Sequence, residues 1–135
     1  MTFVLDACAV IALIRKEQGH ETIRDMLLNE EVNCLMHSIN LCEVYYDCVR
    51  VAGAEQAEIL LEGLEAAGLI VRSDMDTDLW TYAGRLKARG RISLADTFAM
   101  ALAVRENAIL VTSDHHEFDA IMATGECPVK IQFIR

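Results

Sequence analysis

Short apolar runs alternate with longer segments of helical periodicity along almost the whole chain. The apolar runs have the length of buried strands, and the segments between them repeat their apolar residues with the period of a helix. A helix between two strands returns the chain to the edge of the sheet from which it started, so the strands become parallel. The pattern therefore predicts an α/β fold, a three-layer α/β/α sandwich with a mainly parallel central sheet.

The individual elements follow from the same pattern. The expected strands are residues 2–6, 32–38, 69–72, 108–114 and 129–134. The expected helices are residues 7–17, 20–30, 39–52, 54–68, 76–90, 93–106 and 115–125. Gly68 and Gly90 mark the ends of two of these helices, since glycine is common just after a helix.

Length and composition indicate one domain that spans residues 1–135. The chain has 135 residues, 53% of them hydrophobic, and a single proline. That length is within the range of about 100–200 residues expected for one domain. It also suffices to bury a hydrophobic core without disulfides or structural metals. No linker, repeat or low-complexity segment interrupts the pattern.

The cysteines and the N-terminal segment favour a protein of the cytoplasm. The chain has five cysteines, an odd number, and no two of them form a CxxC pair. This argues against a secreted disulfide scaffold and against a zinc ribbon. The N-terminal apolar stretch does not resemble a signal peptide, because Asp6 interrupts it and the basic residues follow it. No apolar run approaches the roughly 18 residues of a membrane span, so we expect no membrane association.

Four acids stand at positions where a ligand site is expected. Asp6 and Asp114 end two of the expected strands, and open α/β sheets bind ligands at the carboxyl ends of their strands. Glu43 and Asp96 lie near the start of helices that are otherwise largely apolar. Asp6 and Asp96 have no basic neighbour in the sequence, although an isolated carboxylate in apolar surroundings is costly. The four acids could therefore converge above the sheet.

Helix capping is the alternative explanation for each of these acids. A carboxylate is favourable in the first turn of a helix, where it accepts hydrogen bonds from free amides and interacts with the helix dipole. Asp6 could cap the helix that follows it. Three pairs have the spacing of a capping box: Ser93 with Asp96, Asn40 with Glu43, and Asp114 with Glu117. For any single acid, capping is at least as good an explanation as a ligand site.

Capping does not require acids at all four positions. Carboxylates that cluster repel one another, and their pKa values rise unless a cation neutralises them. A divalent metal would remove this conflict, and oxygen-only ligands favour Mg²⁺ or Mn²⁺. Such sites polarise a phosphoryl oxygen and generate a hydroxide nucleophile.

Four stretches carry a resemblance to a known family: VLDACAVIAL, INLCEVYY, LADTFAMALA and ILVTSDHHEF. In this order and with these spacings the chain resembles the PIN-domain ribonucleases, and most of all the VapC-type toxins of toxin–antitoxin pairs. The resemblance spans nearly the whole chain. It implies a parallel α/β/α fold, an acidic site with Mg²⁺, for which Mn²⁺ can substitute, and metal-dependent hydrolysis of RNA. It also implies an antitoxin partner and a homodimer.

The resemblance assigns roles to individual residues. Asp6, Asp96 and Asp114 would hold the metal directly or through water, and Glu43 would bind it or orient the attacking water. Thr112 matches a hydroxyl that often precedes the last acid by two residues. Cys8 departs from the family, whose members often carry Ser, Thr or Asn there. A thiol is a poorer hydrogen-bond partner than a hydroxyl, so this departure affects the support of Asp6.

The net charge of −9 argues against non-specific nucleic-acid binding, because phosphates are bound by lysine and arginine. A nuclease must therefore concentrate its positive charge. The densest basic cluster consists of Arg85, Lys87, Arg89 and Arg91, and it ends two residues before Ser93. We expect this cluster at the rim of the site, where it would bind RNA. The alternative is a solvated helix C-terminus, where the dipole favours cations.

Other functions remain as alternatives. A PIN-like module that binds RNA or protein without cleaving it would share the fold, but it would not need all four acids. A phosphatase with Asp6 as nucleophile would want a second Asp where Cys8 stands. A phosphoacceptor domain of the receiver type would want a lysine after the fourth strand, and none is there.

Overall fold

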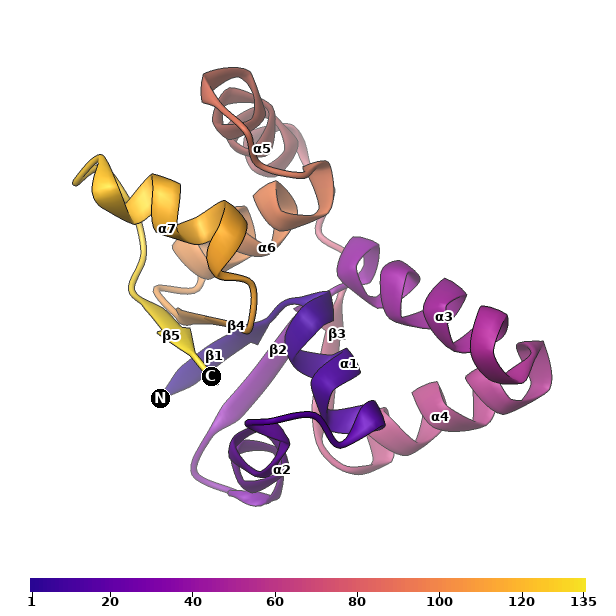
Figure 1. Cartoon of the computed structure of the whole chain (residues 1–135). Coiled ribbons are helices and arrows are strands. Elements are labelled where there is room, and N and C mark those ends of the chain that lie inside the picture. The colour runs from indigo at the N-terminus through magenta and orange to yellow at the C-terminus, as the bar shows by residue number, and fades with distance from the viewer.

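The five expected strands form one parallel sheet in a computed structural model that describes residues 1–135 (Figure 1). The strands are β1 (Thr2–Leu5), β2 (Asn33–His37), β3 (Leu69–Arg72), β4 (Ile109–Thr112) and β5 (Ile131–Phe133). Their order across the sheet is β3-β2-β1-β4-β5. The chain builds outwards from β1 in one direction and then crosses to the other side. This order places the topological switch point between β1 and β4, where such sheets open a crevice for ligands.

All seven expected helices form, with ends that differ from the expectation by a few residues at most. They are α1 (Ala7–Arg15), α2 (His20–Leu28), α3 (Ser38–Ala52), α4 (Ala54–Ala66), α5 (Thr77–Arg89), α6 (Leu94–Arg105) and α7 (His115–Ala123). The predicted α/β/α architecture with a parallel sheet is therefore confirmed. None of these helices combines the length and the apolar character that crossing a membrane would require.

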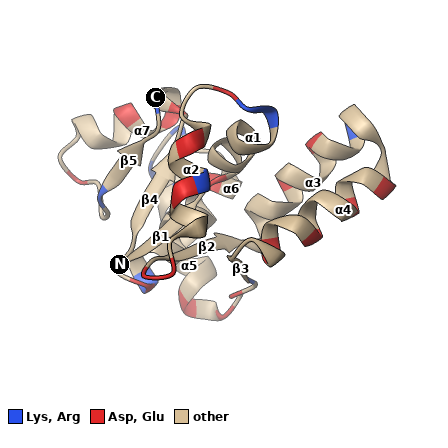
Figure 2. Cartoon of the chain, turned by 90° about the horizontal axis from the view of Figure 1, so that it is seen from below, with Lys and Arg blue, Asp and Glu red and all other residues tan.

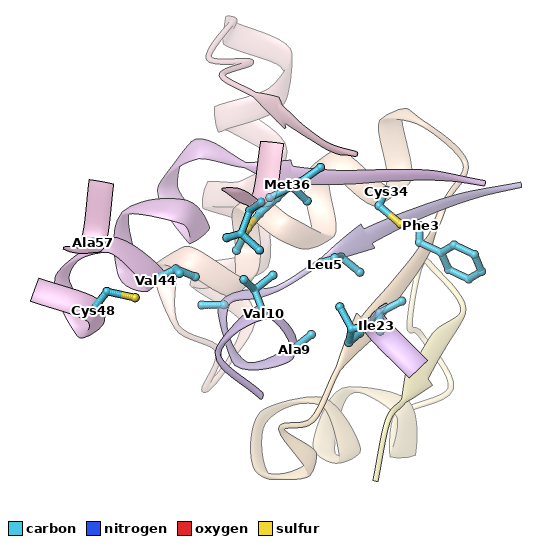
Figure 3. Close-up of a cluster of buried hydrophobic side chains, with 14 residues drawn as sticks. Phe3, Leu5, Ala9, Val10, Ile23, Cys34, Met36, Val44, Cys48 and Ala57 are labelled. Carbon is cyan, nitrogen blue, oxygen red and sulfur yellow. The ribbon is translucent and has the colours of Figure 1, made fainter. Parts of the chain in front are cut away.

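The strand β1 shows how the two faces of the sheet are covered. Phe3 and Leu5 point into a cluster that joins the sheet to α1, α2, α3 and α4 (Figure 3). Val4, between them, points to the opposite face and packs with residues of α6 and with Phe118 of α7. Such alternation requires a strand that is apolar on both sides, which explains why the β1 sequence is a continuous apolar run. A third, smaller cluster packs α5 against α6.

Three of the expected caps are confirmed, and one is wrong. Asp6, Ser93 and Asp114 each accept a hydrogen bond from the first turn of the helix that follows. Asn40, however, does not cap the helix that carries Glu43. That helix begins at Ser38, one residue before the expected start, and His37 caps it, so Asn40 lies in the first turn of α3 and not at the cap position. Asn40 is fully buried there, and its amide Nδ2 donates to the carbonyl oxygen of Ala95 at 3.1 Å. The side chain thus ties α3 to the first turn of α6.

Candidate active site

Asp6 and Asp114 meet at the switch point of the sheet. Asp6 directly follows β1, Asp114 comes two residues after β4, and these two strands are hydrogen-bonded neighbours. Because both strands run in the same direction, both acids lie at the same edge of the sheet. Each also caps the helix that leaves this edge, so the backbone fixes the position of its carboxylate.

Asp6 is a fully buried acid with one unsatisfied oxygen. Its Oδ1 accepts from the backbone N–H of Ala9 at 2.9 Å, but its buried Oδ2 has no hydrogen-bond partner. Burial raises the pKa of Asp6 from 3.8 to about 7, and the neighbouring charges of Asp114 and Glu43 add to this effect. The hydroxyl of Thr112 and the Ala9 N–H act in the opposite direction. Thr112 also accepts from the backbone N–H of Asp114 at 3.0 Å, so it supports both acids.

Asp96 and Asp114 are joined by a third carboxylate, Glu117. One oxygen from each of these side chains can be chosen so that all three lie within 4.8 Å of one another. The three acids come from α6, from the end of the loop after β4 and from α7. We call them the acid trio. Glu117 is held by the backbone N–H of Ser93, which donates to its Oε2 at 3.2 Å.

Asp96 cannot ionise freely in this position. Burial raises its pKa from 3.8 to about 9, and Glu117 and Asp6 contribute to the rise. The hydrogen bond with Asp96 lowers the pKa of Glu117. Two carboxyl groups this close do not both ionise readily without a cation. Ser93 stabilises the arrangement, since its Oγ donates to Asp96 Oδ2 at 2.9 Å.

Glu43 and Cys8 border the acid trio. The pKa of Glu43 is raised by burial and by the charge of Glu117. Burial raises the pKa of the Cys8 thiol to about 12, and the charges of all four predicted acids, Asp6, Asp114, Asp96 and Glu43, raise it further. The charges of the four acids that the sequence predicts therefore all act on one thiol, and the four acids lie in the same part of the molecule.

These residues fit a divalent cation. The donor set consists of carboxylate oxygens, which hard cations such as Mg²⁺ prefer. Asp6 has a buried oxygen without a partner, and the pKa values of Asp6, Asp96 and Glu43 are all raised. Neither Asp6 nor Asp96 forms an ion pair with a lysine or arginine. A cation would supply the positive charge that the chain itself does not place here.

A comparison with family models decides the family. The model of the PIN domain matches residues 3–122, a range that contains the acid trio together with Asp6 and Glu43. The chain belongs to the PIN domain family.

Solved structures show the same fold over nearly all of this PIN domain. VapBC2 from Rickettsia felis, bound to a DNA fragment from its promoter, has a TM-score of 0.74 at 20% identity and covers 98% of both chains. VapBC-1 from nontypeable Haemophilus influenzae has a TM-score of 0.73 at 22% identity, with 99% of this chain and 98% of that chain covered. VapC20 from Mycobacterium tuberculosis, a toxin that cleaves the sarcin-ricin loop, has a TM-score of 0.70 at 16% identity, with coverage of 87% and 94%. No curated protein matches the sequence.

Glu117 lies in the candidate site, a position that the sequence pattern does not predict. The spacing of Asp114 and Glu117 suggested a capping box, in which Glu117 would accept from the N–H of Asp114. Instead, that N–H donates to Thr112, and Glu117 accepts from Ser93 in another part of the chain. The spacing was a signal that an acid stood near the site, but it could not show which partner the acid would find.

The basic cluster divides into residues with different surroundings. Lys87 is engaged within the fold, since its Nζ donates to the carbonyl oxygen of Ile92 at 2.7 Å. Arg89 and Arg91 line a groove that also reaches Glu117 of the acid trio. Arg85 is exposed and does not line this groove. Two of the four predicted basic residues are thus next to the site, as the sequence position before Ser93 suggested.

Proposed function

We propose that this PIN domain is a metal-dependent endoribonuclease that hydrolyses phosphodiester bonds of RNA, and that it is the toxin of a toxin–antitoxin pair. The observation that carries the proposal is the convergence of the acid trio with Asp6 and Glu43, none of which forms an ion pair with a lysine or arginine. A binding module has no need for such a costly cluster, because buried and crowded carboxylates destabilise a fold without a cation.

Each residue of the cluster has a proposed role. Asp6, Asp96 and Asp114 would hold Mg²⁺, or Mn²⁺ in its place, and Glu117 joins this set. When bound, the cation neutralises charge on the phosphoryl group and lowers the pKa of water. Glu43 lies on α3, and the charge of Glu117 raises its pKa, so we assign it to orienting the attacking water or to binding the cation. Thr112 holds Asp6 and Asp114 in place, and Cys8 fills space among the acids.

The fold and the cysteines support the remaining parts of the proposal. Two of the similar structures described above are VapBC structures, and the VapC-type toxins that this chain resembles belong to toxin–antitoxin pairs. We therefore propose an antitoxin as a protein partner and a homodimer as the assembly. All five cysteines are free thiols, which fits the reducing conditions of the cytoplasm.

Cleavage of structured RNA tests the proposed activity. The purified chain is incubated with a mixture of structured RNAs in Mg²⁺, in Mn²⁺ or in chelator, beside Asp96→Asn. We expect cleavage that needs the metal and that the variant loses by at least ~100-fold, an effect typical of a removed group in a charged transition state. Glu62→Gln is the matched control, because Glu62 is an exposed acid on α4. Cleavage that resists both chelator and Asp96→Asn excludes the proposal.

Expression in a bacterium tests the role as a toxin. We expect the wild-type chain to arrest growth and Asp96→Asn to leave growth unchanged at equal protein levels. RNA cleavage in vitro without any growth defect would support a nuclease but contradict a toxin. The absence of both RNA cleavage in vitro and growth arrest would favour the non-catalytic PIN module.

A further inference from the structure

The groove beside the acid trio has the size and the lining of a ligand site. It lies between the C-terminal end of α5 and α7, has a volume of about 560 Å³, and is lined by two carboxylates, Glu117 and Glu126. Small-molecule sites span roughly 300–1,000 Å³, so this volume suits one nucleotide with part of its neighbour. Leu86, Ile92 and Ile121 give it an apolar lining, and Arg89 and Arg91 add positive charge.

The arginines of this groove differ from the other arginines of the protein. Each arginine outside residues 85–91 forms an ion pair with a carboxylate: Arg15, Arg24, Arg50, Arg72, Arg105 and Arg135. None of the three arginines within residues 85–91 does so, although the chain carries 21 acidic residues. Two of these three, Arg89 and Arg91, line the groove.

A helix dipole does not explain this arrangement fully. Lys87 and Arg89 lie in the last turn of α5, where cations are favourable without any ligand. Arg91 lies beyond the end of that helix and lines the same groove. Unpaired guanidinium groups around an apolar pocket match a ligand with an apolar face and a negative charge, and guanidinium groups bind phosphate well. A nucleotide has both features.

We propose that this groove is a nucleotide subsite, which receives the nucleotide next to the bond that is cleaved. The base lies against Leu86, Ile92 and Ile121, and Arg89 and Arg91 hold its phosphate. This inference rests on the proposed function for its choice of RNA as the ligand. The shared residue Glu117 supports it, because it places the groove next to the acid trio and therefore next to the reacting phosphate. An acidic segment of a protein partner is the competing occupant.

RNA binding without cleavage tests the subsite. The probe is a fluorescein-labelled pentauridylate, whose anisotropy is measured with the purified chain in EDTA. We expect the double variant Arg89→Ala/Arg91→Ala to weaken binding by at least ~10-fold. The dependence of affinity on salt should also become shallower, by about 0.7 in log–log slope for each phosphate of the single strand that the variant no longer neutralises. The control is Lys16→Ala/Lys130→Ala, which removes two cations that form no ion pair and lie outside the groove. It should change the affinity less than twofold.

A second variant separates the groove from simple surface charge. Ala120 is exposed and lines the groove from α7, so Ala120→Trp fills the space without changing the charge. We expect it to weaken RNA binding by at least ~5-fold with an unchanged melting temperature. Unchanged affinity in both variants overturns the subsite, and so does a weakening by the arginine variant that Ala120→Trp does not reproduce.

The binding assay contains no metal, so its result is independent of catalysis. If the wild-type chain binds RNA through the groove but cleaves nothing in Mg²⁺ or Mn²⁺, the proposed activity fails and the subsite holds. If it cleaves RNA while all variants bind equally, the activity holds and the subsite fails. Variants that bind RNA normally but lose an acidic protein partner would assign the groove to that partner and overturn the proposal.

Discussion

Asp96 illustrates how one residue can belong both to the capped turn of a helix and to a candidate site. Its backbone N–H donates to Ser93 Oγ at 3.2 Å, so it belongs to the capped first turn of α6. Its side chain, however, lies with Asp114 and Glu117, where burial and the neighbouring carboxylates raise its pKa. An acid at a helix start can therefore belong both to the capped turn and to a cluster of acids.

The stability of Asp96→Asn should depend on pH. In the folded chain Asp96 has a pKa of about 9, whereas its ordinary value is 3.8, so the folded state binds more protons. The stability of the wild type therefore falls as pH rises from about 4 to about 9. Asn stays neutral, so Asp96→Asn should raise the melting temperature in EDTA, by roughly 3–5 °C at pH 8 and by less at pH 5. A lower melting temperature at both pH values would contradict the crowded cluster.

Asn40 should contribute to stability through a single buried hydrogen bond. Asn40→Ala removes this hydrogen bond between α3 and α6, while the Ala95 carbonyl stays within the helical hydrogen bonding of α6. Losing one hydrogen bond of this kind costs about 0.5–1.5 kcal/mol, which thermal unfolding would record as a lower melting temperature. Asn33→Ala is the matched control, because Asn33 is exposed. Equal melting temperatures for both variants would show that Asn40 does not tie α3 to α6.

At the scale of elements, periodicity was sufficient to predict every strand and helix. β1 and β4 are apolar on both faces because helices cover both sides of the sheet, and this produces the continuous apolar runs that identify them. The sequence pattern starts α3 at residue 39, one residue after its observed start. The cap is His37, whose ring nitrogen accepts from the backbone N–H of Ile39. Histidine is not among the usual capping residues, so the sequence carried no familiar signal there.

The candidate site was predictable only where the backbone positions it. Asp6 and Asp114 follow strands that lie side by side, so knowledge of the strand ends alone brings them together. Glu117 and Asp96 meet through the packing of α6 and α7, and sequence spacing does not determine how two helices meet. For the same reason, the split of the basic cluster into Lys87 and the groove arginines could not be foreseen.

An ion-pair network joins the loop before α5 to the end of α6. Arg105 contacts Asp74 at 3.0 Å and Asp76 at 2.6 Å, and Arg72 contacts Asp74 and Glu106. The hydrogen bonds from Arg72 and Arg105 lower the pKa of Asp74 to about 2. The network is thus complete above pH 4, and its contribution to stability is lost as pH falls towards 2.

Arg105→Gln should lower the melting temperature by a few degrees at pH 7 and low salt. The difference from wild type should shrink in 1 M salt, because the charges are partly exposed and are screened. It should also shrink towards pH 2, where Asp74 becomes protonated. Arg24→Gln provides the comparison, since Arg24 pairs only with its neighbour Asp25 on an exposed helix face. A salt-independent difference would point to packing of the Arg105 side chain instead.

At the scale of the whole molecule, the net charge of −9 is distributed in a way that an RNA-binding protein can use. Acidic residues occur on helices throughout the fold (Figure 2), whereas most arginines are paired with them. The free arginines lie in one segment at the end of α5, close to the acid trio. Repulsion by the remainder of the surface would oppose loose binding of RNA and favour contact where these arginines lie.

Cation binding should stabilise the whole fold, because the acid trio and Asp6 come together only when the chain is folded. A ligand that binds the folded state alone at about 100 times its Kd adds about 2.7 kcal/mol of stability. For a chain of this size, Mn²⁺ should therefore raise the melting temperature by roughly 5–10 °C. Asp96→Asn should lose most of this increase, and Glu62→Gln, which alters an exposed acid on α4, should retain it. An equal increase in both variants would mean that Mn²⁺ binds elsewhere, and the acid trio would then have no cation to neutralise it.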